Sequence, residues 1–187
     1  MALISPSDQQ KLRESFAEMT RAVRLLFFTQ AFDCDTCQQT RRILDELPPL
    51  SDKITIEEVN IILEGDTARQ YGVDRAPAVA IEYEGARGAH GAQGAHGAQG
   101  AGGAEHFLHP EHFEHPEHSA HPAHPEHLEW KDSRIRFLGT PAGYEFISLV
   151  QAVLLAGGRA SILSEWSHKR IAAVDRPMTM HVFTTPT

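Results

Sequence analysis

Cysteine is scarce in this sequence, and the chain has no second cysteine pair. Cys34 and Cys37 are the only two cysteines among 187 residues. A structural zinc site usually takes four ligands, either two cysteine pairs or one pair with two histidines. The lone Cys-x-x-Cys therefore favours a redox-active dithiol, and half of a zinc knuckle is the alternative.

Long apolar runs and an excess of positive charge are also missing. No apolar stretch is long enough to cross a membrane, and no basic region followed by an apolar one opens the sequence, so a secretory signal is not expected. With 17 Lys and Arg against 25 Asp and Glu, the formal charge of -8 gives no reason to bind nucleic acid. We expect a soluble, cytoplasmic protein with no cofactor and neither a nucleic-acid nor a membrane partner.

Large apolar residues are few in residues 85–129, which instead repeat glycine, alanine, histidine and proline in triplets. Such a segment cannot bury enough surface to offset its loss of conformational entropy, so we expect a disordered insert. Histidine recurs at every third position from His106 to His127, and the intervening prolines favour a polyproline II chain that spaces these side chains about 9 Å apart. Because zinc binds nitrogen at about 2.1 Å, the pattern predicts weak, adventitious metal binding and no dedicated site.

The two cysteines follow an apolar run and open an amphipathic stretch. Val23–Thr29 predicts a buried strand, and residues 34–47 predict a helix with an apolar face. Because residues three apart share one side of a helical turn, Cys34 and Cys37 can form a disulfide there. We expect Cys34 to be the nucleophile and Cys37, on the apolar face, to be the resolving thiol.

Acidic residues flank the first cysteine. The amino end of a helix lowers a cysteine pKa from its usual value of about 8.5, whereas Asp33 and Asp35 place negative charge beside Cys34 and oppose the thiolate. We therefore expect a Cys34 pKa closer to that of a reducing dithiol than to that of a strong oxidant.

The remaining periodicity predicts further elements on both sides of the insert. A helix should begin at Ser5, where Ser-Pro-Ser-Asp is a start signal. Pro48 should stop the helix that holds the cysteines. We also expect strands at residues 54–59, 78–83 and 135–138, and helices at residues 67–71 and 144–155.

This order of elements resembles the thioredoxin fold, an α/β architecture with a mixed four-stranded sheet flanked by helices. Asp74-Arg75-Ala76-Pro77 before the third strand resembles the cis-proline loop that faces the dithiol in that fold. The resemblance implies a cis peptide bond at Pro77 and implies that Ala76 and Pro77 bind the substrate. Arg75 itself is interpreted as a solvated loop charge.

A closer resemblance is to the prokaryotic protein disulfide oxidoreductases, which are glutaredoxin-like proteins with two tandem thioredoxin units. It rests on the Asp74–Pro77 loop together with Ser51-Asp52-Lys53-Ile54 and residues 139–146, Gly-Thr-Pro-Ala-Gly-Tyr-Glu-Phe. The resemblance implies a protein disulfide oxidoreductase that acts on disulfide-containing proteins and is served by an unidentified thiol or flavoprotein reductant.

The carboxy-terminal residues repeat the amino-terminal ones at an offset of 155. Residues 176–184 resemble residues 21–29, and the preceding helices also correspond. We expect a thioredoxin-like domain at 1–157, interrupted by the insert, and the start of a second unit at 158–187 that stops before a second Cys-x-x-Cys. The apolar strand expected at Met178–Phe183 would need a sheet edge to join.

A second function stays open at this point. The chain could be a catalytically weak remnant, or a histidine-rich metal-binding protein built on a thioredoxin scaffold. The sequence favours the thiol-disulfide oxidoreductase, because its cysteine pair lies between the expected strand and the expected helix.

Overall fold

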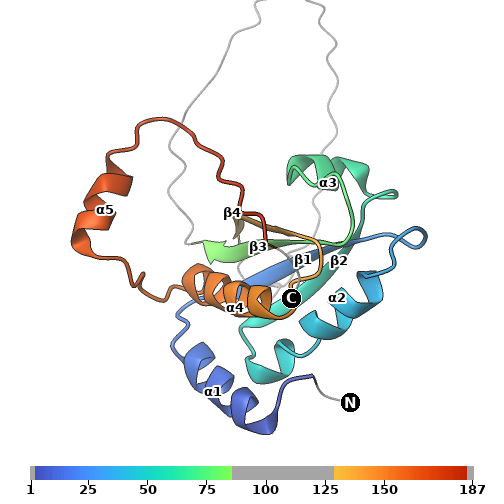
Figure 1. The fold of residues 1–187 in the computed structure, drawn as a ribbon, viewed down its shortest axis with the longest axis horizontal. Coiled ribbons are helices and arrows are strands. Elements are labelled where there is room, and N and C mark those ends of the chain that lie inside the picture. Colours follow the sequence, from blue (N-terminus) through green and yellow to red (C-terminus); the bar gives the residue numbers. More distant parts are fainter. Residues whose placement is uncertain (1–2, 86–128, 185–187) are drawn as a thin grey trace, which may run out of the picture. The chain divides into compact units, whose positions relative to one another are not determined.

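The computed structural model describes residues 3–85 and 129–184 (Figure 1). Its sheet has the strand order β2-β1-β3-β4, and β1 runs parallel to β2 and antiparallel to β3. The strands are β1 (Val23–Thr29), β2 (Ile54–Asn60), β3 (Ala78–Gly85) and β4 (Glu129–Leu138). The strand predicted before the cysteines therefore forms at its predicted bounds and occupies the centre of the sheet.

Helices cover both faces of the sheet. They are α1 (Pro6–Ala17), α2 (Cys37–Leu44), α3 (Gly65–Gln70) and α4 (Tyr144–Ala156), with α5 (Glu165–Ala172) following them. The Oγ atom of Ser5 accepts a hydrogen bond from the Asp8 N–H and so caps α1 as its sequence predicts. Side chains of α1, α2 and α4 share one apolar cluster with β1, and Ala68 of α3 belongs to a second cluster on the opposite face.

The strand β1 is buried on both faces because nearly all of its side chains are apolar. Leu25 and Phe27 belong to the larger cluster, whereas Leu26 and Phe28 belong to the cluster beneath α3. Alternate residues of a strand point to opposite faces, so a single apolar run supplies both cores. This explains why apolar and polar residues do not alternate along the strand.

The prediction for the helix after the cysteines was wrong at its start. α2 begins at Cys37 and not at Cys34, and a short 3₁₀ turn at Pro48–Leu50 follows where only a stop was expected. Asp33 has a φ of 56°, in the left-handed region, so the chain turns before the cysteines and cannot yet be helical there. The buried face of α2 is as predicted and includes Cys37, Thr40 and Leu44.

The carboxy-terminal strand prediction was also wrong. The described residues 173–184 form no strand, and Met178, Met180, Val182 and Phe183 are 66% or more exposed. A strand needs neighbouring backbone groups to pair with, and this segment pairs with neither edge of the sheet. The preceding helix is present as α5, with no buried residue.

The predictions made for residues 85–129, disorder and metal binding, fall almost entirely outside the described residues. The two strands that flank this segment are described, and they show that it connects β3 to β4 as expected. β4 is longer than the predicted 135–138. Within the described ranges, no helix has the length and apolar character needed to cross a membrane.

A buried carboxylate lies on the α3 face of the sheet, at the end away from the cysteines. Glu82 of β3 is 2% exposed and accepts hydrogen bonds from the Tyr71 hydroxyl and from Arg24 of β1, whose Nε is 2.7 Å away. Arg24 also contacts Glu57 at 2.6 Å and lies over the ring of Trp130. Burial, together with the bond to Glu82, raises the pKa of the Tyr71 hydroxyl.

We predict that Arg24→Met lowers the free energy of unfolding by about 1–3 kcal/mol, because it leaves the Glu82 carboxylate buried without its cation. Urea unfolding followed by circular dichroism measures this change. Arg13→Met, on an exposed face of α1, is the matched control and should change stability by less than about 0.5 kcal/mol. Equal losses in the two variants would show that the pair at Glu82 does not stabilise the sheet.

Candidate functional site

Four segments meet at one edge of the sheet. The parallel strands β1 and β2 both end there, since Thr29 pairs with Asn60, and β3 begins there, since Phe28 pairs with Ala78. The N–H of Gly139 donates to the carbonyl of Pro77 at 2.8 Å and brings the residues after β4 to the same edge. Loops at residues 30–36, 61–64, 74–77 and 139–143 therefore surround one site.

The two cysteines form a disulfide in the first of these loops. The Cα atoms of Cys34 and Cys37 are 5.4 Å apart, within the usual range for a disulfide. Cys34 is partly exposed, whereas Cys37 is 8% exposed and belongs to the larger apolar cluster. The prediction that Cys37 is the more buried sulfur is confirmed.

Hydrogen bonds hold the loop in place. The side-chain amide of Gln30 donates to the carbonyl of Asp33 at 2.9 Å, and the N–H of Cys37 donates to the carbonyl of Cys34 at 3.3 Å. Cys34 therefore lies in a turn that precedes α2.

The charges nearest the disulfide are negative. Asp33 and Asp35 are exposed, and neither has an ion-pair or hydrogen-bond partner for its side chain among the described residues. The only buried polar side chains in the described ranges are those of Thr29, Thr40 and Glu82. Glu82 is thus the only described carboxylate that is buried, and it lies at the end of the sheet away from the cysteines.

The loop before β3 has the peptide geometry that the resemblance implied, because the Ala76–Pro77 bond is cis. Among the described residues, no backbone group of Arg75 or Ala76 makes a hydrogen bond, so these groups remain open at the site. The Arg75 guanidinium binds the carboxylate of Asp74 at 2.8 and 3.0 Å. This bond lowers the pKa of Asp74 and largely neutralises the pair.

A hydrogen bond between two threonines ties α2 to the loop at residues 139–143. The hydroxyls of Thr40 and Thr140 are 2.9 Å apart, and the Thr40 Oγ1 also donates to the carbonyl of Thr36 at 3.0 Å. Thr40 is fully buried. The sequence offered no signal for this contact, because the two residues lie 100 positions apart in the chain.

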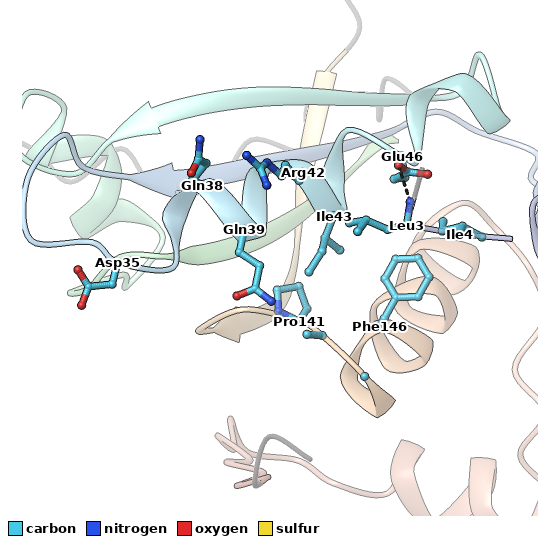
Figure 2. A pocket seen from close by; sticks show the side chains of 12 residues that line it. Leu3, Ile4, Asp35, Gln38, Gln39, Arg42, Ile43, Glu46, Pro141 and Phe146 are labelled. Atoms are coloured by element: carbon cyan, nitrogen blue, oxygen red, sulfur yellow. Dashed lines mark hydrogen bonds between the residues drawn. The ribbon is translucent and has the colours of Figure 1, made fainter. Parts of the chain in front are cut away.

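Beside the disulfide, a groove of about 660 Å³ runs between α2 and the start of α4 (Figure 2). Ile43, Phe146 and Pro141 line its apolar part, and Gln39 points toward Pro141. Asp35 borders the groove at the end nearest the cysteines, and Arg42 lines it without an ion-pair partner in the described part of the chain. Within the described ranges, no group of histidine, cysteine and acidic residues is placed to hold a metal ion.

Solved structures with the same arrangement of helices and strands identify the fold of this chain. A mutant of the alkylhydroperoxide reductase protein AhpF from Enterococcus faecalis matches with a TM-score of 0.61 and 25% identity over 91% of this chain. The NTD_N/C domain of the same protein matches with a TM-score of 0.60 and 23% identity over 92% of this chain. The chain has a thioredoxin-like fold.

A protein disulfide oxidoreductase from Aeropyrum pernix K1 has the same fold. It matches with a TM-score of 0.56 and 19% identity over 90% of this chain. The thioredoxin-like chain spans 60% and 62% of the two AhpF structures and 54% of the A. pernix protein. No protein-family model and no curated protein matches the sequence.

We predict that Thr40→Val destabilises this thioredoxin-like domain by about 1–3 kcal/mol, because it leaves the Thr140 hydroxyl and the Thr36 carbonyl without their buried partner. Thermal or urea unfolding of the oxidised protein measures the loss. Thr55→Val on an exposed position of β2 replaces the same atoms and should be nearly neutral. An unchanged stability in Thr40→Val would mean that the hydrogen bond to Thr140 is not needed to hold the site together.

Proposed function

We propose that the chain is a thiol-disulfide oxidoreductase that acts on disulfides in proteins. The observation that supports this best is the Cys34–Cys37 disulfide, which has one accessible and one buried sulfur at the edge where four loops meet. Such a pair can open to a dithiol and close again without a large movement of the backbone.

In the reductive direction, the thiolate of Cys34 attacks one sulfur of the substrate disulfide. The substrate S–S bond breaks, a Cys34–substrate disulfide forms, and the other substrate sulfur leaves as a thiolate that takes up a proton. The Cys37 thiolate then attacks Cys34 and releases the second substrate thiol. The substrate gains two electrons and two protons, and the protein is left with the Cys34–Cys37 disulfide.

In this proposal, the loop that contains the cis bond holds the substrate. The open backbone groups of Arg75 and Ala76 can form hydrogen bonds with an extended polypeptide, as in the addition of a strand to a sheet. Pro77 has no backbone N–H and therefore adds no donor at this position. Ala76 and Pro77 are therefore the proposed substrate-binding residues beside Cys34 and Cys37.

The proposed direction is reduction in a cytoplasmic setting. The negative charges of Asp33 and Asp35 disfavour the thiolate form of Cys34, which is typical of a dithiol that acts as a reductant. A cytoplasmic compartment keeps such a cysteine pair reduced. A separate thiol or flavoprotein must then supply the two electrons of each cycle. The proposed substrate class is that named for the A. pernix protein disulfide oxidoreductase, whose fold this chain shares at 19% identity.

The proposed domain division also rests on the repeat. Residues 1–157 form the thioredoxin-like unit around the insert, and residues 158–187 begin a second unit. The correspondence of α5 with α1 at the offset of 155 supports this division, because both helices precede a run of apolar residues.

We predict that the chain catalyses reduction of insulin by dithiothreitol and that Cys34→Ser abolishes this catalysis. Turbidity from the released insulin chains measures the rate, and the uncatalysed reaction sets the baseline. Ser161→Cys, which adds an unrelated thiol after α4, is the control and should keep the wild-type rate. If Cys34→Ser were as fast as the wild type, the proposed role of Cys34 would be refuted, and rates equal to the uncatalysed baseline in both proteins would identify a remnant without useful turnover.

A further inference from the structure

Exposed apolar side chains lie in two loops at the edge of the sheet where Cys34 is also found. Phe32, two residues before Cys34, is 84% exposed. Ile62 and Leu63, which follow β2, are 72% and 82% exposed. These three residues, called the apolar rim below, leave a large apolar surface in water, which is unfavourable unless another molecule covers it.

The two loops that contain the apolar rim follow neighbouring strands. β1 and β2 are parallel, and the N–H of Ile61 donates to the carbonyl of Thr29 at 2.9 Å. The chain after β2 therefore starts beside the loop that leads to Cys34. In Figure 1, the loop before α2 and the loop before α3 lie on the same side of the sheet.

The turn after β2 fixes its two apolar side chains in the exposed position. The side-chain oxygen of Asn60 accepts hydrogen bonds from the N–H groups of Ile62 and Leu63 at 3.0 and 3.1 Å. The carbonyl of Asn60 accepts another from the N–H of Glu64 at 2.7 Å. A binding surface held in this way loses little conformational freedom when a ligand covers it.

The charges around the apolar rim are negative and largely uncompensated. Asp33, Asp35 and Glu64 have no cationic partner within the described residues. Two nearby cations are already paired, because Arg69 binds Asp66 and Arg75 binds Asp74. Arg42 has no ion-pair partner in the described part of the chain, and it lines the groove between α2 and α4 that Asp35 also borders.

We propose that the apolar rim binds the residues flanking a substrate disulfide and selects polypeptides in which these flanks combine a large apolar side chain with lysine or arginine. The proposal rests on the proposed function. Burial of an apolar flank against Ile62 and Leu63 supplies affinity, and a nearby cation meets the carboxylates of Asp33 and Asp35.

Four peptides with one common disulfide-bridged ring test the selection. Their flanks are Leu-Lys, Leu-Glu, Ser-Lys and Ser-Glu, and kcat/KM for their reduction is measured with dithiothreitol as the reductant. We expect the Leu-Lys peptide to be reduced about tenfold more efficiently than the Ser-Glu peptide. The preference for lysine over glutamate should shrink in about 0.5 M salt, which screens the charges. Equal kcat/KM values for the four peptides would overturn the proposal.

A double variant in the turn after β2 distinguishes the contribution of the apolar rim from that of the dithiol. Ile62→Ser with Leu63→Ser should lower kcat/KM for the Leu-Lys peptide about fivefold and leave the rate with dithiodipyridine, a small neutral disulfide, unchanged. Ile171→Ser with Val174→Ser removes exposed apolar side chains at and after α5 and should change neither rate. An equal loss with dithiodipyridine would overturn the rim's role, whereas a wild type that reduces neither compound would instead refute the proposed function.

Discussion

Burial of β1 on both faces fixes the positions of the elements around it. Leu25 and Phe27 complete one apolar cluster, and Leu26 and Phe28 complete the other, so the strand must be central and must have neighbours on both edges. Because β1 is parallel to β2 and antiparallel to β3, its carboxyl end meets the end of β2 and the start of β3. The cysteines follow β1 directly, which places them where these loops converge.

The two cysteines differ in exposure because Cys34 lies in a turn and Cys37 lies in α2. Cys34 belongs to a turn with two unpaired carboxylates nearby, whereas Cys37 is the first residue of α2 and faces the apolar cluster. The Cys34 sulfur is therefore accessible from solvent, whereas the Cys37 sulfur is enclosed by the protein. The open backbone of Arg75 and Ala76 lies at the same edge, so the residues that the proposed function assigns to substrate binding and disulfide exchange come from separate parts of the sequence.

Much of the fold and of the candidate site was predictable from the sequence, and the predictions that were wrong failed for physical reasons. The bounds of β1 followed from its apolar run, and the buried position of Cys37 followed from helical periodicity. The start of α2 was missed because the left-handed turn at Asp33 leaves no periodic signal. The strand expected at Met178–Phe183 does not form because a strand depends on partners that a local pattern cannot supply. The contact of Thr40 with Thr140 depends on tertiary packing in the same way.

Trapping of the mixed disulfide shows which of the two cysteines attacks the substrate. Reduced Cys37→Ser protein is mixed with a disulfide-bonded peptide, and the adduct is mapped by mass spectrometry without added reductant. We expect a persistent adduct on Cys34, because no second thiol remains to release the peptide, and no lasting adduct in the wild type. A comparable adduct on Cys37 in the Cys34→Ser variant, or no adduct on Cys34, would contradict the assignment of Cys34 as nucleophile.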